Sequence, residues 1–305
     1  MHLLRCSRRC LLLSCLAAMA LLPRQASAQL DVLQARLDSI AASIPATAGI
    51  AVKLLGSEEV LSVNGHARLP MQSVYKFPLA LAVLNAVEEG ELSLDQICHL
   101  TPEDLLPDTW SPLRDDHPGG YADVTVRELL RYTVSLSDNN GCDVLFRLLG
   151  GPRRVEDYIH RIDVTQIAIR TTEAEMARRW PVQYRNWAEP LAVLRLLEIF
   201  YEGGLLTDGH RGLLLQWMTE TPTGPQRLKG LLPPEAGVAH KTGTSSIRAD
   251  GLIAATNDAG ILLLPDGRAV AVVVLVSDAR ADRAACEALI ARTARAVWDY
   301  CLANP

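Results

Sequence analysis

The spacing of apolar residues predicts strands at both ends of the chain and helices between them. A helical period over residues 31–44 is followed by a β-rich stretch over 48–63, which Gly56 and Ser57 interrupt. The predicted central helices cover 73–87, 124–133, 141–149 and 191–201, joined by loops without strands. Strands are predicted at 237–244, 252–257, 261–264 and 269–276, and an amphipathic helix at 281–302.

This order predicts an α/β fold of the α+β kind. One antiparallel sheet is expected to form from N- and C-terminal segments, flanked by the terminal helices, with an all-helical lobe inserted between them. We expect an α/β lobe made of 29–68 and 212–305, an all-α lobe over 69–211, and an active site between the two lobes.

Residues 1–28 have the layout of a secretory signal peptide. Three arginines precede an apolar stretch from Leu11 to Leu22, and small residues at 26–28 predict cleavage after Ala28. A membrane anchor is disfavoured because about twelve apolar residues are too few to span a bilayer. The export route stays open, since the leader resembles both a twin-arginine signal and, less closely, a lipoprotein cleavage box. We expect a periplasmic protein without stable membrane association after processing.

Composition limits the choice of partner. The formal net charge of −5 becomes more negative once a leader with four arginines is removed. An acidic chain binds polyanions poorly, so nucleic acid is not an expected partner. With 49% hydrophobic residues the protein is expected to be globular. We further expect a monomer that acts on a small molecule and needs no cofactor.

The four cysteines beyond the leader suggest no nucleophile. Cys286 and Cys301 fall in one predicted helix, about 20 Å apart along its axis, which is too far for a disulfide. For Cys98 and Cys142, a disulfide and two buried free thiols fit the sequence equally well.

The first candidate for chemistry is Ser73-Val-Tyr-Lys76, at the start of a predicted helix. Ser73 would lie near unpaired backbone N–H groups at the positive helix end, and Lys76 projects from the same face one turn later. A lysine beside a serine hydroxyl can remove its proton and so activate a nucleophile. Because this pattern also arises by chance about once in a chain of this length, it carries little weight alone.

Ser137-Asp138-Asn139 precedes a predicted helix and has two interpretations. In the first it is an ordinary helix cap. In the second, Ser137 passes a proton to a departing amide nitrogen and Asn139 holds a substrate amide group.

Lys241-Thr242-Gly243-Thr244 falls on a predicted strand, where a surface lysine is the simplest interpretation. In a functional interpretation Lys241 binds a substrate carboxylate, and Thr242 lines the same edge. Gly243 then allows close approach of a ligand, and the Thr244 backbone N–H joins that of Ser73 in an oxyanion hole.

In this order the three motifs resemble those of the penicillin-recognising serine enzymes. Residues 172–176 and 182–187 narrow the resemblance to the class A β-lactamases, especially the subgroup with the PER and VEB extended-spectrum enzymes, over essentially the whole mature chain. The resemblance implies hydrolysis of penicillins and cephalosporins through a serine acyl-enzyme, conferring resistance. It gives Glu173 the activation of water, with Glu175 as the nearby rival. Lys76 is assigned to acylation, although the family leaves open whether Lys76 or Glu173 deprotonates Ser73.

The resemblance also implies two binding residues and shows three departures. Trp110 matches an aromatic wall at the site entrance and Arg227 a position that reaches the substrate carboxylate; a buried tryptophan and a surface arginine are the alternatives. Ala177 stands where many class A enzymes place an asparagine beside the hydrolytic water. Thr171 and Asn186 replace an arginine and an aspartate that commonly bridge the loop, so we expect a differently arranged, wider pocket.

Other functions fit the sequence less well. The seven histidines form no zinc-binding pattern, so no metal is expected. A DD-peptidase and a penicillin sensor that stays acylated are the alternatives, and Glu173 argues against both because it provides a base for deacylation.

Overall fold

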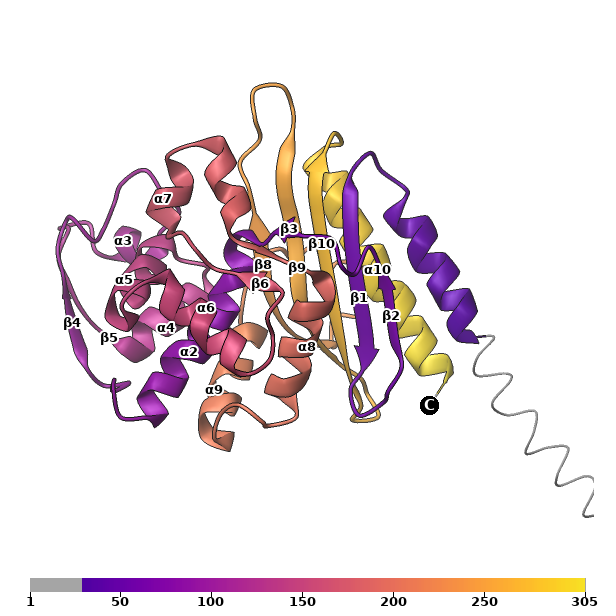
Figure 1. Cartoon of the computed structure of the whole chain (residues 1–305), viewed down its shortest axis with the longest axis horizontal. Helices are drawn as coiled ribbons and strands as arrows, with labels where there is room; N and C mark the ends of the chain where they lie inside the picture. The colour runs from indigo at the N-terminus through magenta and orange to yellow at the C-terminus, as the bar shows by residue number, and fades with distance from the viewer. Residues whose placement is uncertain (1–28, 305) are drawn as a thin grey trace, which may run out of the picture.

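The computed structural model describes residues 29–304 and shows a five-stranded antiparallel sheet with helices on both faces (Figure 1). The strand order is β2-β1-β10-β9-β8. The strands are β1 (Thr47–Leu54), β2 (Val60–Val63), β8 (Gly237–Thr244), β9 (Ile253–Leu263) and β10 (Ala269–Ala279). The predicted fold class, with a sheet built from both ends of the chain, is therefore confirmed.

Strand β9 corrects one prediction. The sequence pattern divided it into 252–257 and 261–264, because polar residues interrupt the apolar run, but the structure has one strand over Ile253–Leu263. The polar side chains of Asn257 and Asp258 are fully buried and hydrogen-bonded. Satisfied polar groups are tolerated in a central strand, so the strand continues through them.

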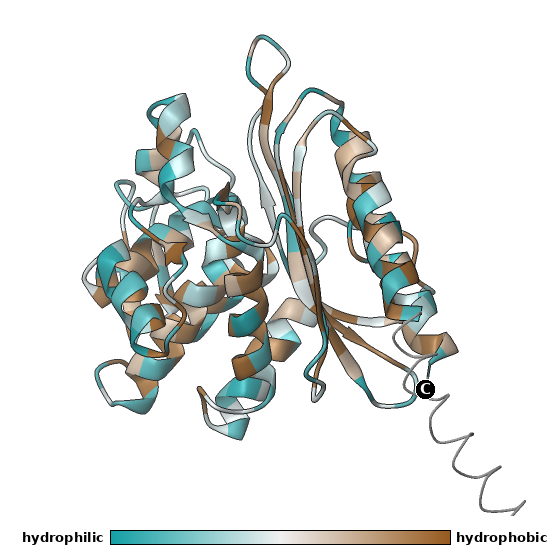
Figure 2. Ribbon diagram, turned by 45° about the vertical axis from the view of Figure 1, so that its right-hand side comes forward, coloured by the Kyte–Doolittle hydropathy of each residue, from teal (hydrophilic) through white to brown (hydrophobic). Residues whose placement is uncertain are grey.

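The terminal helices cover one face of the sheet. The N-terminal helix over 29–41 and α10 (Arg283–Ala303) pack on this face (Figure 2). Along β10, Val272 and Val274 belong to the core beneath these helices, whereas Val273 and Leu275 belong to the core on the opposite face. Successive side chains of a strand point to opposite faces, so a sheet covered on both sides requires the nearly continuous apolar sequence seen in β10.

The middle of the chain forms the helices on the other face. They are α2 (Lys76–Glu88), α3 (Pro112–Asp116), α4 (Val126–Ser135), α5 (Asn139–Leu149), α6 (Pro152–Arg161), α7 (Glu173–Ala177), α8 (Pro190–Tyr201) and α9 (Asp208–Thr219). The prediction that this part contains only helices and loops was wrong. Five short strands form two small sheets: β3 (Leu69–Pro70), β4 (Ile97–Leu100), β5 (Ala122–Thr125), β6 (Ile167–Ala168) and β7 (Trp187–Ala188). Strands of two to four residues are too short to show a period of two. The proposed lobe boundaries stay a prediction.

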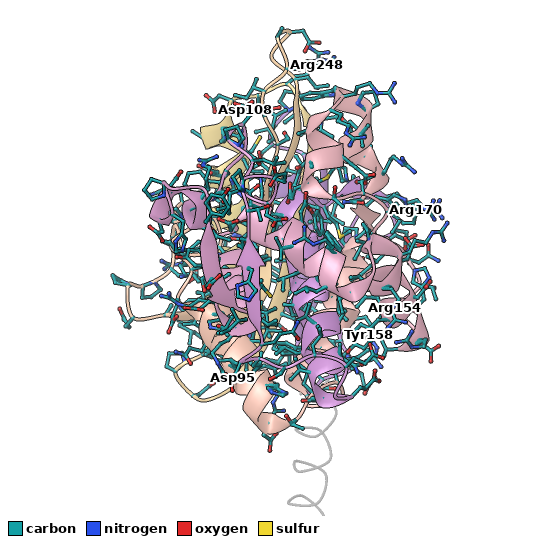
Figure 3. All side chains as sticks on the ribbon, turned by 90° about the vertical axis from the view of Figure 1, so that its left-hand side faces the viewer. Asp95, Asp108, Arg154, Tyr158, Arg170 and Arg248 are labelled. Carbon is teal, nitrogen blue, oxygen red and sulfur yellow. The ribbon has the colours of Figure 1, made fainter. Side chains whose placement is uncertain are left out.

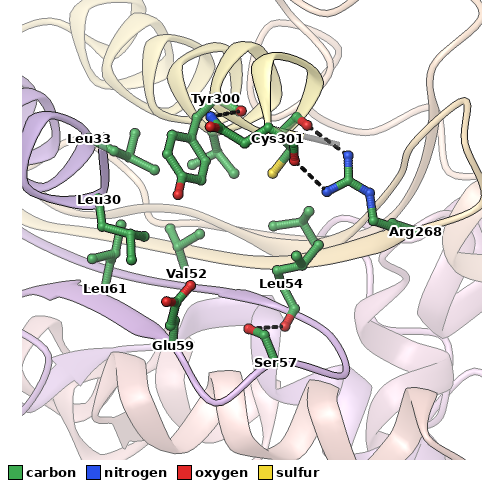
Figure 4. A pocket seen from close by; sticks show the side chains of 13 residues that line it. Leu30, Leu33, Val52, Leu54, Ser57, Glu59, Leu61, Arg268, Tyr300 and Cys301 are labelled. Atoms are coloured by element: carbon green, nitrogen blue, oxygen red, sulfur yellow. Dashed lines mark hydrogen bonds between the residues drawn. The ribbon is translucent and has the colours of Figure 1, made fainter. Parts of the chain in front are cut away.

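The cysteines of the described residues are free and buried. This settles the open question for Cys98 and Cys142 in favour of free thiols. Cys301 lines a pocket of about 210 Å³ between the terminal helices and the ends of β1 and β10 (Figure 4). Burial raises the pKa of this thiol to about 11, which makes it a poor nucleophile at neutral pH.

The predicted signal peptide lies outside the described residues. Within 29–304, no helix is both long and apolar enough to cross a membrane.

Candidate active site

Ser73 lies in a short 3-10 helix, η1 (Gln72–Tyr75), directly before α2. The preceding residue, Gln72, has a left-handed backbone with φ of 47°, a conformation that costs a non-glycine residue about 1–3 kcal/mol. The Gln72 side chain is held in place, because its Nε2 donates to Gln183 Oε1 over 2.7 Å. A strained but anchored turn therefore places Ser73 at the start of α2.

The sheet fixes the loop before Ser73. Asn257 on β9 donates from Nδ2 to the carbonyl oxygens of Pro70 at 2.8 Å and Met71 at 3.0 Å. Gly243 on β8 passes so close that a Cβ there would lie 2.3 Å from the Met71 carbonyl oxygen. From the sequence, this glycine is expected to allow the close approach of a ligand. The structure shows the chain's own backbone in that space, so a larger residue would displace the Ser73 loop.

Lys76 lies at the centre of the site and is fully buried. Its Nζ donates to Ser137 O at 2.8 Å and Asn139 Oδ1 at 2.5 Å, and lies 3.0 Å from Glu173 Oε1. A buried ammonium requires such partners. Lys76 lies one helix turn after Ser73. Through these contacts it connects α2 to the segment of Ser137 and to the start of α7.

Ser137 connects the two lysines. Its Oγ accepts a hydrogen bond from Lys241 Nζ over 2.9 Å, while its carbonyl accepts from Lys76. Ser137 has a left-handed φ of 58°, a strain of the kind that concentrates at functional sites. Asp138 is the N-cap of α5 and accepts the Gly141 N–H over 2.7 Å. The helix-cap interpretation thus holds for Asp138, whereas the residues on either side of it bond to the lysines.

Lys241 is buried in the described chain with 1% of its surface exposed. Burial lowers the pKa of Lys241 well below its usual value, and the charge of Lys76 lowers it further. The carboxylates of Asp258 and Glu173 act in the opposite direction. The charge state of Lys241 therefore depends on its acidic neighbours.

Glu173 is the first residue of α7, and its side chain is 11% exposed. Asp143 on α5 fixes this helix end, because its Oδ1 accepts the Glu173 N–H at 2.7 Å and its Oδ2 accepts the next backbone N–H at 2.9 Å. The rival carboxylate, Glu175, accepts the N–H of the N-cap residue at 3.0 Å in a capping box. Glu173, with Oε1 at 3.0 Å from Lys76 Nζ, is thus the better candidate for the base.

Replacing Asp143 by asparagine is expected to change the pH dependence of stability. Burial raises the pKa of Asp143 to about 6. Between about pH 4 and 6 the Asp143 carboxyl is protonated in the native state and ionised in the unfolded chain. This group therefore makes the free energy of unfolding fall as pH rises through that range. Asp143→Asn removes that contribution and leaves one N–H of α7 unpaired, at a cost of about 1–3 kcal/mol. Urea unfolding between about pH 4 and 7 tests this; a constant difference between variant and wild type would contradict it.

Asn186 closes the loop that carries Glu173. Its Oδ1 accepts the N–H groups of Arg170 at 2.8 Å and Thr171 at 3.0 Å, and its Nδ2 donates to Thr171 O at 2.8 Å. Its own carbonyl accepts the Met71 N–H at 2.9 Å. An amide bonded to backbone therefore closes the loop where the sequence lacks an arginine–aspartate pair, and it connects the loop to Met71, two residues before Ser73.

A pocket of about 200 Å³ lies beside Glu173. Ala177 lines it, together with Asn139, Asp143 and the loop over 106–109. Ala177 stands where the resemblance leads one to expect an asparagine. Because alanine has no polar side chain, this position adds space to the pocket and offers no side-chain hydrogen bond.

Trp110 contacts the segment of Ser137 and Asn139, because its carbonyl accepts the Asn139 N–H at 3.0 Å. The Trp110 side chain is exposed, with 61% of the residue's surface accessible, and its indole N–H is donated to Leu136 O at 2.9 Å. Figure 3 shows Asp108 and Arg248 at this end of the molecule. Asp108 lines the pocket beside Glu173, and the Arg248 guanidinium lies 5.5 Å from the centroid of the Trp180 ring. The hairpin between β8 and β9 thus contacts the Glu173 loop.

Arg227 acts from beneath the strand edge. It is 3% exposed and bonds to Thr244 Oγ1 at 2.8 Å, Gly243 O at 3.1 Å and Glu287 Oε1 at 3.1 Å. Arg227 is therefore not the surface arginine of the simpler interpretation. The residue of the candidate strand edge whose side chain it contacts is Thr244, so it also differs from an arginine that reaches the substrate carboxylate directly. The Thr242 hydroxyl pairs with Thr223 Oγ1 at 2.8 Å.

Three residues that support the site, Asp143, Asn257 and Gln183, are not among the site residues predicted from the sequence. Asn257 was detectable as a polar interruption in an apolar strand. Asp143 lies in a helix without any motif, and Gln183 lies in the segment 182–187 that carried the resemblance without a role of its own. Only their contacts with distant residues show what they do.

This fold and this group of residues are typical of penicillin-recognising serine enzymes. The model of the β-lactamase enzyme family matches residues 32–301. The chain is 42% identical over 276 residues to the extended-spectrum β-lactamase PER-1 of Pseudomonas aeruginosa, covering 90% of this chain and 89% of the relative. It is 40% identical over 278 residues to β-lactamase VEB-1 of the same organism, covering 90% and 92%.

Solved structures agree. A β-lactamase from Chitinophaga pinensis superimposes with a TM-score of 0.86 at 49% identity, covering 88% of this chain and 99% of that one. The extended-spectrum β-lactamase TLA-1 superimposes with a TM-score of 0.87 at 44% identity, covering 89% and 99%. The chain therefore belongs to the β-lactamase enzyme family, among the class A serine enzymes. Its activity is the hydrolysis of β-lactams, which confers resistance to these antibiotics.

Proposed function

We propose that Ser73 is the nucleophile of this β-lactamase and that Lys76 removes its proton. The Glu173 carboxylate, 3.0 Å from Lys76 Nζ, can accept a proton from the ammonium and leave an amine to act as base. Ser73 Oγ then attacks the lactam carbonyl, the carbon–nitrogen bond breaks, and the nitrogen receives a proton from Ser137. Ser137 regains a proton from the Lys76 ammonium, and Glu173 returns its proton to the Lys76 amine, so that Glu173 is again a carboxylate before deacylation. Ser137 is suited to this because its Oγ and its carbonyl contact the two lysines.

Deacylation returns the enzyme to its starting state. Glu173 takes a proton from water, the hydroxide attacks the ester carbon, and Ser73 regains its proton as the ester bond breaks. The backbone N–H groups of Ser73 and Thr244 stabilise the oxyanion in both steps. The observation that carries this proposal is the position of Glu173, directed at Lys76 by Asp143. Glu173→Gln, argued in the Discussion, tests it.

Substrate binding is assigned to the strand edge and the entrance. Lys241 and Thr242 bind the substrate carboxylate together with Thr244, whose hydroxyl Arg227 orients at 2.8 Å. Asn139 binds the side-chain amide, and its Nδ2 is fixed by Thr109 Oγ1 at 2.7 Å. The exposed ring of Trp110 packs against the substrate.

We further propose that oxyimino-cephalosporins are good substrates. The pocket of about 200 Å³ beside Glu173 gives room for a bulky acyl substituent, because Ala177 is small and Asn186 closes the loop through backbone contacts. PER-1 and TLA-1 are named extended-spectrum enzymes. We expect kcat/KM for cefotaxime within about 200-fold of that for benzylpenicillin, since a difference of one group in a pocket is worth about 1–3 kcal/mol, or about 10–200-fold. Steady-state kinetics with both drugs test this; a negligible cefotaxime rate would contradict it.

We propose that the mature enzyme acts as a monomer in the periplasm, exported by the leader over 1–28 and not held at the membrane. The arginines, apolar stretch and small residues of the leader support export.

A further inference from the structure

A buried histidine–aspartate pair lies directly behind Lys241. His240 precedes Lys241 on β8 and, because side chains alternate along a strand, points to the opposite face of the sheet. Its Nδ1 lies 2.8 Å from Asp258 Oδ1 and 2.9 Å from Asp258 Oδ2. Neither residue has exposed surface. Asp258 stands opposite Thr242 on β9, so the pair is attached to the same two strands as the substrate-binding edge. The mechanism proposed above uses neither side chain.

The pair carries a negative charge. Asp258 accepts hydrogen bonds from His240 and, at 3.2 Å, from the Leu228 N–H. His240 Nε2 is buried without a hydrogen-bond partner in the described part of the chain. A protonated ring would leave a charged N–H unsatisfied there, which is costly, so a neutral imidazole with its proton on Nδ1 is favoured. The buried charge is thus that of the Asp258 carboxylate.

Lys241 needs a negative charge nearby. Its Nζ is hydrogen-bonded to neutral oxygens, Ser137 Oγ at 2.9 Å and Thr242 O at 3.1 Å. Burial, Lys76 and Arg227 all favour the uncharged amine, whereas Asp258 and Glu173 favour the ammonium. Of these two carboxylates, Glu173 lies 3.0 Å from the other buried lysine, Lys76.

Three other cationic side chains lie around the His240–Asp258 pair, and none of them removes the Asp258 charge. Arg227 is paired with Glu287 at 3.1 Å. Burial lowers the pKa of Lys229, and Asp258 raises it in part. On α10, burial and Arg227 lower the pKa of Arg283. The charged groups that act on Lys241 are thus two cations, Lys76 and Arg227, and two carboxylates, Asp258 and Glu173.

We propose that Asp258, oriented by His240, is a positioning residue for β-lactam hydrolysis whose buried carboxylate keeps Lys241 protonated to bind the substrate carboxylate. This rests on the proposed role of Lys241. Since the reaction needs the ammonium, kcat/KM falls when pH rises above the pKa of Lys241. Removing the Asp258 charge lowers that pKa, so the fall must begin at lower pH.

The test is the pH profile of kcat/KM for benzylpenicillin in the wild type, Asp258→Asn and His240→Leu. We expect the basic limb of Asp258→Asn to move to lower pH by about one pH unit or more, as for loss of a neighbouring opposite charge. His240→Leu removes the donor that orients the carboxylate, and its basic limb is expected to move in the same direction by less. His240→Leu also serves if Asp258→Asn does not fold.

The matched control is Glu198→Gln. Glu198 is a buried carboxylate paired with Lys53 at 2.5 Å between α8 and β1, away from Ser73. It is expected to lower stability and leave the basic limb unchanged. If folded Asp258→Asn keeps the wild-type basic limb, or the limb moves equally in Glu198→Gln, the inference is wrong. If Ser73→Ala still hydrolyses benzylpenicillin, the proposed function itself fails, whatever the profile of Asp258→Asn.

Discussion

Replacing Glu173 by glutamine is expected to trap the enzyme as an ester on Ser73. Glutamine keeps the size of the side chain and cannot take a proton from water, so deacylation loses its base. General base catalysis contributes about 10²–10⁴-fold, and we expect kcat for benzylpenicillin to fall by about 10³-fold. In the variant the Lys76 ammonium can lose its proton to solvent in place of Glu173, so acylation continues more slowly while deacylation has no base, and kcat falls far more than kcat/KM. A stopped-flow burst of one equivalent with nitrocefin, followed by slow turnover, is the measurement.

The control for this variant is Glu175→Gln. Glu175 lies two residues further on, and its carboxylate caps α7 through a hydrogen bond of 3.0 Å. Its loss should change stability and leave kcat within a few-fold of wild type. Equal losses of kcat in both variants would show that the integrity of α7 matters and not the Glu173 carboxylate.

Replacing Lys76 by alanine is expected to stop the reaction one step earlier. Without the amine, Ser73 loses its base, and kcat/KM should fall by about 10³-fold with no accumulation of acyl-enzyme. The variant also leaves Glu173 without its cationic partner at 3.0 Å, and breaking a buried pair costs about 3–5 kcal/mol. Single-turnover acylation rates and urea unfolding measure the two effects separately.

Lys53→Ala provides the matched control for this second variant. Lys53 forms a largely buried pair with Glu198, with side chains 11% and 9% exposed. It should show a comparable loss of stability with unchanged kinetics. If Lys76→Ala acylates at the wild-type rate, another group deprotonates Ser73, and Glu173 becomes the first candidate.

The sequence indicated which residues of the candidate site lie together better than it indicated their supports. Each of the four residues stands in a short motif that a local pattern finds. Ser73 and Lys76 are one helix turn apart, Ser137 lies just before α5, and Lys241 lies on β8. Glu173 followed only from resemblance, because a glutamate in a loop has no local signature. Asp143, which fixes the N–H of Glu173 at 2.7 Å, lies 30 residues away along the chain, and such contacts have no local pattern.

The fold shows the same division. The two ends of the chain were predicted to form one sheet, because long apolar strands have a clear pattern. The split of β9 was wrong because Asn257 and Asp258 are buried polar residues whose partners, Met71 and His240, cannot be inferred from neighbouring positions. Asn257 and Asp258 therefore do not end the strand. They bond to the loop before Ser73 and to the strand that carries Lys241.

The most direct test of the account is intact-protein mass spectrometry of the wild type, Glu173→Gln and Lys76→Ala, quenched at intervals after mixing with benzylpenicillin. The account predicts a penicilloyl adduct on Ser73 that disappears within turnover in the wild type, persists in Glu173→Gln and forms slowly in Lys76→Ala. An adduct that clears from Glu173→Gln as fast as from the wild type would contradict the assignment of Glu173 as the base that releases the acyl group.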